Sequence, residues 1–197
     1  MAAPTMTKSE SRTSVPVRCV HLLRHGQYTP EPGRGDGPLT PLGRRQAKTA
    51  GRYLKRWPIR QLSASDLERA SETATIVARE MGVSRWEQSA LLREVVPSAI
   101  PGARVPLEKR RASREAVERV LARYFGSSAS TRHDLLVCHG NLIRALVCAV
   151  IGAPATAWLR LATRHCALTS IAVLPDGERR LIRYGEGAYL SDSLLTG

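Results

Sequence analysis

Two histidines stand at matching places in the chain, each directly after a predicted buried strand. His25 follows the apolar run of residues 18–23, and His139 follows the apolar run of residues 134–138. In an open α/β sheet, ligands bind in the crevice beyond the carboxyl ends of the strands. If these two strands are parallel neighbours, both imidazoles reach the same crevice. A neutral imidazole persists at pH 7 and can attack phosphorus, so the pair suggests phosphoryl transfer.

Cationic and donor groups accompany the first histidine. Arg24 adjoins it, and Arg69 lies one turn into the helix that is predicted after a short strand ending near residue 65. Gly140 and Asn141 place free N–H groups at the start of another predicted helix, which is a natural anion site. Such groups suit phosphoryl transfer because the reacting charge lies on the nonbridging phosphate oxygens.

Glu94 is the candidate for the proton that the leaving group needs, and its carboxylate could then deprotonate the incoming water. Taken singly, each candidate has an ordinary structural explanation: Glu94 as a surface carboxylate paired with Arg93, Arg69 as a solvated helix residue, and His139 as a hydrogen-bonded structural histidine. Their occurrence together and in order is what favours a common site.

Other chemistries find less support. His21 alternates with apolar neighbours and is interpreted as a core or sheet histidine, whereas His133 is assigned to a polar loop. The chain contains no H-E-x-x-H or paired-carboxylate motif for a metal and no G-x-S-x-G nucleophile elbow. The site is therefore expected to work without a metal or another cofactor.

Alternating strands and helices must position these residues. The predicted fold class is α/β, with a mostly parallel sheet covered on both faces and an antiparallel part near the C-terminus. Thr40 is expected to cap a helix, and Ser113 another. The predicted helices cover residues 41–57, 66–81, from 113 onwards, and 142–151; the predicted strands cover 18–23, 59–64 and 134–138, followed by a hairpin over 168–184.

Length and composition bound the class of protein. A chain of 197 residues with 43% hydrophobic residues suits one soluble domain. We expect a disordered lead-in over 1–17 and one domain over 18–197; a transit peptide is a weaker interpretation of the lead-in. No apolar run is long enough to span a membrane. The four cysteines show no disulfide or C-x-x-C spacing, so a reducing compartment is indicated and a cytoplasmic location is predicted.

The net charge of +13 attracts anionic partners. The excess is spread along the chain without interleaved aromatic residues, so no dedicated nucleic-acid partner is expected. The segment 97–113 is expected to form the rim of the pocket, where its cations suggest a further anionic group on the substrate. These cations are Arg104, Lys109, Arg110 and Arg111. The apolar C-terminal hairpin and tail could supply a homodimer contact.

The chain resembles the histidine phosphatase (phosphoglycerate-mutase-like) superfamily. The matching segments are Leu22-Leu23-Arg24-His25-Gly26, Leu39-Thr40-Pro41-Leu42-Gly43, Ser65-Asp66-Leu67-Glu68-Arg69-Ala70, Leu92-Arg93-Glu94 and Cys138-His139-Gly140-Asn141-Leu142-Ile143-Arg144. The resemblance implies a phosphoric monoester hydrolase of the histidine acid type with a three-layer α/β/α sandwich. It also implies a phosphohistidine on His25, a phosphate pocket of Arg24, Arg69 and His139, and Glu94 as proton donor.

Within the superfamily, the chain looks most like mitochondrial protein serine/threonine phosphatases, through Arg24-His25-Gly26-Gln27-Tyr28 and Ala157-Trp158-Leu159-Arg160-Leu161. It departs from them in showing no membrane anchor or long N-terminal extension, which suggests a soluble relative. A phosphoglycerate mutase is disfavoured, because too few residues separate Glu94 from His139 for the mutases' long insertion. A small-metabolite phosphatase and a non-enzymatic module that binds phosphate or phosphoprotein remain alternatives.

Overall fold

The computed structural model describes residues 17–96 and 104–197. The predicted lead-in, apart from Val17, and most of the proline-marked stretch after residue 96 lie outside these ranges. Among the described residues, no helix is long and apolar enough to cross a membrane.

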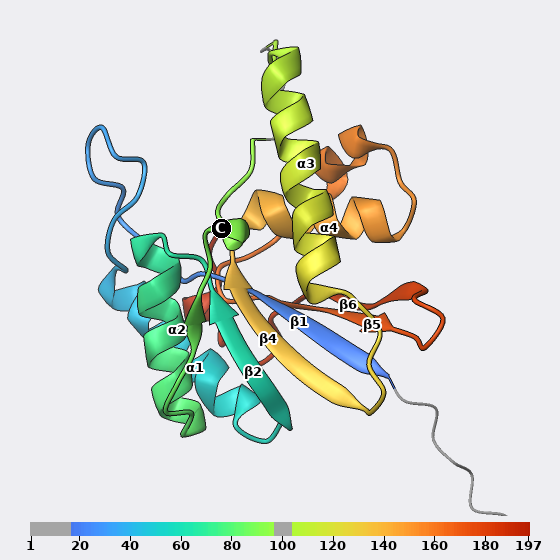
Figure 1. The fold of residues 1–197 in the computed structure, drawn as a ribbon. Coiled ribbons are helices and arrows are strands. Elements are labelled where there is room, and N and C mark those ends of the chain that lie inside the picture. Colours follow the sequence, from blue (N-terminus) through green and yellow to red (C-terminus); the bar gives the residue numbers. More distant parts are fainter. Residues whose placement is uncertain (1–16, 97–103) are drawn as a thin grey trace, which may run out of the picture.

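Six strands form one sheet in the order β3-β2-β4-β1-β5-β6 (Figure 1). The first four strands in this order run parallel to one another, whereas β5 is antiparallel to both of its neighbours. This arrangement confirms the predicted mostly parallel sheet with an antiparallel C-terminal part. The strands are β1 (Arg18–Arg24), β2 (Ile59–Ala64), β3 (Glu87–Gln88), β4 (Arg132–Cys138), β5 (Leu168–Val173) and β6 (Arg179–Glu186).

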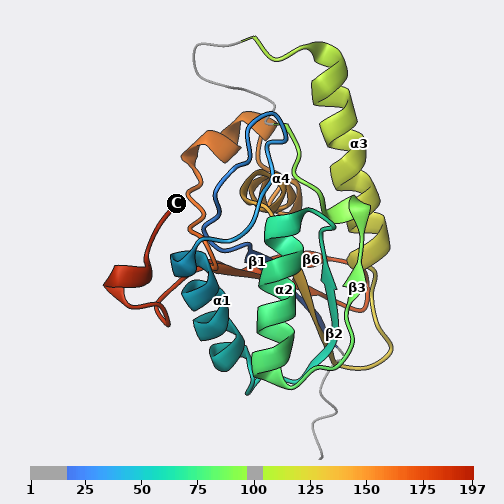
Figure 2. The same ribbon diagram turned by 90° about the vertical axis from the view of Figure 1, so that its left-hand side faces the viewer.

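Helices cover both faces of the sheet. The pair α1 and α2 lies on one face, side by side in Figure 2, and the pair α3 and α4 lies on the other. The α-helices are α1 (Pro41–Leu54), α2 (Glu68–Met81), α3 (Leu107–Tyr124) and α4 (Gly140–Val150), and short 3-10 turns occupy Ala90–Leu92, Ala155–Arg160 and Asp192–Leu194.

Apolar side chains that alternate between the two faces of the central strands form the two hydrophobic cores. Leu22 packs with α3 and α4, whereas its neighbour Leu23 packs with α1 and α2. Leu136 and Leu135 on β4 divide in the same way, and all four leucines are at most 1% exposed. Because successive side chains on a strand point to opposite faces, apolar residues in both positions require two covered faces. The result is the predicted α/β/α sandwich.

Local signals set the ends of the α1 and α2 helices. The Thr40 hydroxyl accepts the N–H of Gly43 at 3.0 Å, and Pro41 occupies the first turn of α1, as predicted. Gly82 ends α2 with a φ of 77°, a left-handed conformation that glycine adopts without a Cβ clash.

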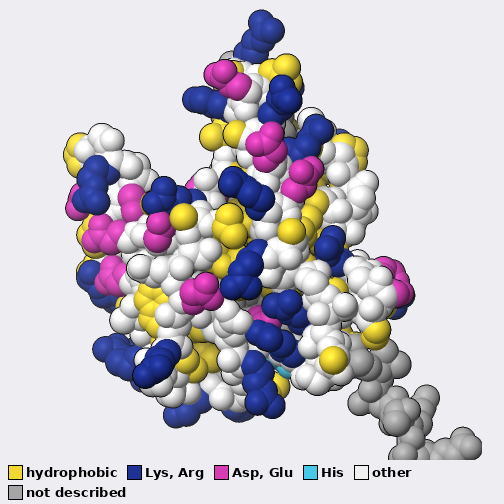
Figure 3. Space-filling view, viewed as in Figure 1, with side chains coloured by type: hydrophobic (Ala, Val, Ile, Leu, Met, Phe, Trp, Pro, Cys, Tyr) yellow, Lys and Arg dark blue, Asp and Glu magenta, His cyan; other side chains and the backbone are white. Residues whose placement is uncertain are grey.

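The helix α3 differs from its prediction. It begins at Leu107, two turns before the expected cap Ser113, and it has no side-chain cap. The Ser113 hydroxyl instead donates to the carbonyl of Val96 at 2.8 Å. The first turns of α3 rise beyond the body of the protein, and a hollow separates them from the loop that follows β1 (Figure 3). The carboxyl ends of β2 and β4 point towards this hollow.

Candidate active site

The sheet brings the two predicted histidines together. Strands β1 and β4 are parallel neighbours with Arg24 opposite Cys138, so the next residue of each strand is a histidine at the same edge. The N–H of His25 donates to the carbonyl of Cys138 at 2.9 Å. The ring centroids of His25 and His139 are 5.1 Å apart. The sequence-based expectation that both imidazoles share one crevice matches this geometry.

Hydrogen bonds fix the tautomer of His25. Its Nδ1 lies 2.8 Å from the carbonyl oxygen of Gly26, which can only accept, so Nδ1 carries the proton. Its Nε2 then has a lone pair, which accepts the Nε–H of Arg69 at 3.2 Å. Burial, followed by the neighbouring His139, holds the pKa of His25 well below its ordinary value. The ring is therefore neutral at pH 7, with Nε2 as its basic atom.

Arg69 is held by a carboxylate that the sequence analysis missed. Its Nη1 lies 2.6 Å from Oδ1 of Asp36, and both side chains are nearly buried. The other carboxylate oxygen of Asp36 accepts the N–H of Glu68 at 2.7 Å, at the start of α2. Burial raises the pKa of Asp36, but the N–H groups of Glu68 and Gly37 and the Arg69 guanidinium outweigh it and leave this pKa below its ordinary value. Asp36 thus links the loop after β1 to the arginine on α2.

Arg24 approaches the site from the end of β1. Its Nη1 donates to the carbonyl of Thr163, and its Nη2 lies 3.1 Å from Nε2 of His165. Its Nε is buried without a partner among the described residues. Gly140 allows this placement, because a Cβ there would lie 3.3 Å from the Arg24 Nε.

His165 is a second residue that the sequence analysis missed. Its ring centroid lies 5.6 Å from that of His25, and its Nδ1 contacts the Thr196 hydroxyl at 3.0 Å. Burial, and then the Arg24 charge, lowers the pKa of His165 to about 4. The next residue, Cys166, has a φ of 53°, which is unusual for a residue other than glycine, and its N–H donates to the Arg24 carbonyl. No motif in the sequence marks this loop.

His139 is fully buried, and neither of its ring nitrogens has a hydrogen-bond partner among the described residues. Burial and the charge of Arg69 lower its pKa to about 3, so the ring is neutral at pH 7. An unpaired polar group in a protein interior is costly, and native interiors contain few of them. Beside the buried Arg69 and the half-buried Arg24, this ring is suited to receive an anionic ligand.

Glu94 lies at the N-terminus of α4. Its Oε1 accepts the N–H of Leu142 at 3.0 Å, and its Oε2 accepts the N–H of Asn141 at 3.3 Å. Burial raises the pKa of this carboxyl, and the backbone N–H bonds oppose the rise in part. Because Glu94 takes the N–H of Asn141, the carboxylate competes with the anion-binding role that the sequence suggested for Asn141.

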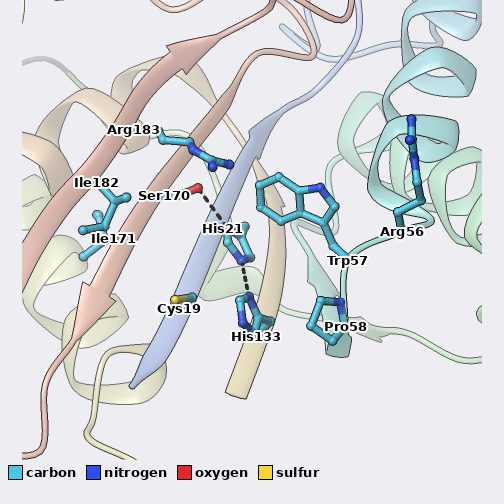
Figure 4. Close-up of a pocket in the computed structure, with 10 residues that line it drawn as sticks. All are labelled: Cys19, His21, Arg56, Trp57, Pro58, His133, Ser170, Ile171, Ile182 and Arg183. Atoms are coloured by element: carbon cyan, nitrogen blue, oxygen red, sulfur yellow. Dashed lines mark hydrogen bonds between the residues drawn. The ribbon is translucent and has the colours of Figure 1, made fainter. Parts of the chain in front are cut away.

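A separate cavity of about 310 Å³ lies on the α1 and α2 face, away from these groups (Figure 4). His21 bridges Ser170 on β5 and His133 on β4 there, at 2.9 and 3.0 Å. The sheet position of His21 agrees with its prediction, but the loop assignment of His133 is wrong, because this residue lies within β4 and pairs across the sheet with Cys19.

In residues 17–96 and 104–197, no three metal-ligating side chains gather in a group that could hold a metal ion.

Comparisons with known proteins point to one family. A family model described as histidine phosphatase superfamily (branch 1) matches residues 20–111 and 98–186. The serine/threonine-protein phosphatase Pgam5, mitochondrial, of Drosophila grimshawi is 32% identical over 203 residues, which cover 95% of this chain and 70% of the relative. The protein of the same name from Caenorhabditis elegans is 30% identical over 198 residues, 95% of this chain and 69% of the relative.

Solved structures show the same fold. The complex of a mycobacterial glucosyl-3-phosphoglycerate phosphatase with inorganic phosphate is 26% identical, with a TM-score of 0.68, and the match covers 88% of this chain and 100% of that one. A phosphoglycerate mutase from Plasmodium falciparum, 23% identical, matches with a TM-score of 0.61 over 86% of this chain and 91% of its own. This second likeness concerns the fold alone.

The relatives contradict the predicted cytoplasmic location, because the Pgam5 proteins are named as mitochondrial. The prediction rested on free cysteines, and all four are indeed free in the structure. Free thiols report the redox state of a compartment rather than its identity, so they could not support the narrower conclusion.

Proposed function

The chain belongs to the histidine phosphatase superfamily, and from this premise we propose that it hydrolyses phosphomonoesters through a phosphohistidine on His25. The observation that carries the proposal is the neutral, buried imidazole of His25. Its Nε2 lone pair faces the Arg69 guanidinium at 3.2 Å, and the unpartnered His139 ring lies 5.1 Å away. A nucleophilic nitrogen, a cationic guanidinium and an imidazole that is free to bond a ligand thus lie close together.

In the first step, the Nε2 of His25 attacks phosphorus, a P–N bond forms and the bond from phosphorus to the ester oxygen breaks. Glu94, protonated, gives its proton to the departing oxygen, and the alcohol leaves. The raised pKa of Glu94 favours this role because it increases the protonated fraction. The Nδ1–H of His25 keeps its bond to the Gly26 carbonyl throughout and orients the ring.

In the second step, a water molecule attacks the phosphorus of the phosphohistidine. The Glu94 carboxylate takes a proton from this water, the P–N bond breaks, and its electron pair returns to Nε2. Inorganic phosphate leaves, and both His25 and Glu94 regain their starting protonation states. No metal enters either step.

The phosphate pocket in this proposal consists of Arg24, Arg69 and His139, with the N–H group of Gly140 at the start of α4, because Glu94 accepts the N–H of Asn141. The two arginines neutralise charge on the nonbridging oxygens, which lie at the reacting centre throughout. Asp36 and His165 act as positioning residues in this proposal, because Asp36 pairs with Arg69 and His165 contacts Arg24.

Phosphorylated serine or threonine in a protein is the proposed substrate, and the similarity to the Pgam5 phosphatases supports it. A small phosphorylated metabolite is the alternative, which the likeness to the mycobacterial glucosyl-3-phosphoglycerate phosphatase favours. Both substrates are phosphomonoesters and need the same two steps.

The proposal is tested by hydrolysis of an aryl phosphate in excess chelator. We compare the wild type with His25→Ala, and with His133→Ala as a matched control in the separate cavity. We expect chelator-resistant turnover in the wild type and the control, and its loss in His25→Ala. Normal turnover in His25→Ala would exclude the proposed nucleophile.

A further inference from the structure

The first turns of α3 bury almost no side chain against the described structure. The buried side chains of this helix, Val117, Val120 and Tyr124, all belong to its second half. Residues 107–115, called the projecting turns below, are exposed except for the half-buried Ser113. At about 1.5 Å per residue, the projecting turns extend roughly 13 Å. In Figure 1 they rise clear of the body of the protein.

The projecting turns, taken with the three residues before them, are basic. From Arg104 to Glu115 the chain has five cations and two carboxylates, a net charge of +3. No cation of this set lies within ion-pair distance of a carboxylate among the described residues, although exposed arginines elsewhere, such as Arg180 with Glu178, do. The cations are Arg104, Lys109, Arg110, Arg111 and Arg114. Unpaired, exposed cations are available to an acidic partner.

The C-terminal end of the projecting turns lies close to the candidate active site. The Ser113 hydroxyl bonds to the carbonyl of Val96, and Val96 is two residues beyond Glu94. Two residues of chain span at most about 7 Å, and Lys109 lies about 6 Å along the helix from Ser113. With the length of the side-chain contact added, Lys109 and the cations nearer to Ser113 lie within roughly 20 Å of Glu94. Figure 3 shows basic side chains on this projection, beside the hollow.

This distance decides the kind of substrate that the cations can meet. A small phosphomonoester bound before His25 occupies the pocket at the sheet edge, whereas the projecting turns rise clear of the body of the protein (Figure 1). An extended peptide, which advances about 3.3 Å per residue, reaches them with side chains about three to six positions from its phosphorylated residue. We propose that the projecting turns of α3 dock acidic residues that flank the phosphorylated serine or threonine of a protein substrate. This inference rests on the proposed phosphatase activity and names the substrate class.

The experiment compares three substrates: an aryl phosphate, a phosphoserine peptide with glutamates four to six positions to either side of the phosphoserine, and the same peptide with glutamines instead. The test variant is Lys109→Glu with Arg111→Glu and Arg114→Glu; Arg110 is kept because its Nε donates to the Val105 carbonyl. The matched control is Lys55→Glu with Arg56→Glu and Arg60→Glu, three exposed cations just after α1 and at the start of β2, at the other end of the sheet. Both variants change the net charge equally.

We expect the wild type to prefer the glutamate peptide in kcat/KM. The test variant should lose about tenfold on that peptide, and turnover of the aryl phosphate and the glutamine peptide should stay near wild type. The control should keep the preference, because its three cations lie at the other end of the sheet. Since both variants carry the same net charge, a general effect of charge would weaken the preference equally in both. Raised salt should weaken the preference, as for any exposed charge contact.

Three results would overturn the inference. The wild type could show no preference for the glutamate peptide, the two variants could lose it equally, or the test variant could instead lose binding to anionic phospholipid vesicles while peptide turnover is unchanged. Failure of the wild type to hydrolyse the aryl phosphate would count against the proposed function itself, so the two proposals fail separately.

Discussion

Replacing Asp36 by asparagine should destabilise the protein strongly, and phosphate should restore part of the loss. Asp36 and Arg69 form an ion pair at 2.6 Å with side chains only 12% and 6% exposed. Removal of one partner from a buried pair leaves an uncompensated charge and costs about 3–5 kcal/mol. The asparagine side chain could offer its single carbonyl oxygen to the Glu68 N–H or to Arg69, and not to both.

The loss should appear as a lower Tm. For a chain of this size, about 1 kcal/mol corresponds to roughly 2–4 °C, so Asp36→Asn should melt on the order of 10 °C below the wild type. The folded pKa of Asp36 lies below its ordinary value, so its stabilisation is present above about pH 4. It is lost as the pH falls through the folded pKa, and the two Tm values should converge there.

Inorganic phosphate distinguishes the role in the site from a purely structural one. A bound anion beside Arg69 replaces the missing negative charge, so saturating phosphate should raise the Tm of Asp36→Asn more than that of the wild type. The control is Asp66→Asn, whose partner Arg93 is 57% exposed and whose ion pair should contribute about 1 kcal/mol at most. A Tm loss in Asp36→Asn no larger than in Asp66→Asn would refute the reasoning.

Three further predictions concern the groups around His25. Glu94→Gln should lower turnover of a phosphoserine peptide by about 10²–10⁴-fold but affect an aryl phosphate far less, because a phenolate leaves without a proton; an equal loss on both would mean that the carboxylate acts by capping α4. Gly140→Ala should raise KM several-fold with little change in Tm, because its Cβ would press on the Arg24 Nε at 3.3 Å; an unchanged KM would contradict that placement. Saturating phosphate should raise the pKa of His139 from about 3, as followed by NMR, because a bound anion opposes burial and the charge of Arg69; an unmoved pKa would place the anion elsewhere.

The sequence was most informative where local pattern and tertiary position coincide. Each predicted histidine ends a central strand, and two parallel neighbouring strands put consecutive positions at one edge, so His25 and His139 meet. The position of Arg69 could be predicted for the same reason, because its helix α2 follows β2, and β2 is the neighbour of β4 in the sheet. Thr40 and Gly82 act within one helical turn and could therefore be predicted.

Asp36 and His165 could not be found in this way, because their roles depend on where long loops return. Asp36 sits in a loop without regular structure and meets Arg69 only through the fold. The start of α3 was misplaced for a different reason: its first turns are charged and exposed, so they carry no apolar periodicity. His133 was assigned to a loop because its polar neighbours hide a strand end.

A phosphoryl group carried on one particular ring nitrogen is central to the proposed mechanism. The most direct test is rapid quench of the wild type during turnover of an aryl phosphate, followed by peptide mapping of acid-labile, base-stable phosphate. We expect phosphate on His25 in the wild type and none in His25→Ala, with the wild type still labelled in excess chelator. Phosphate that maps to His139 or to no histidine, or labelling that survives in His25→Ala, would contradict this mechanism.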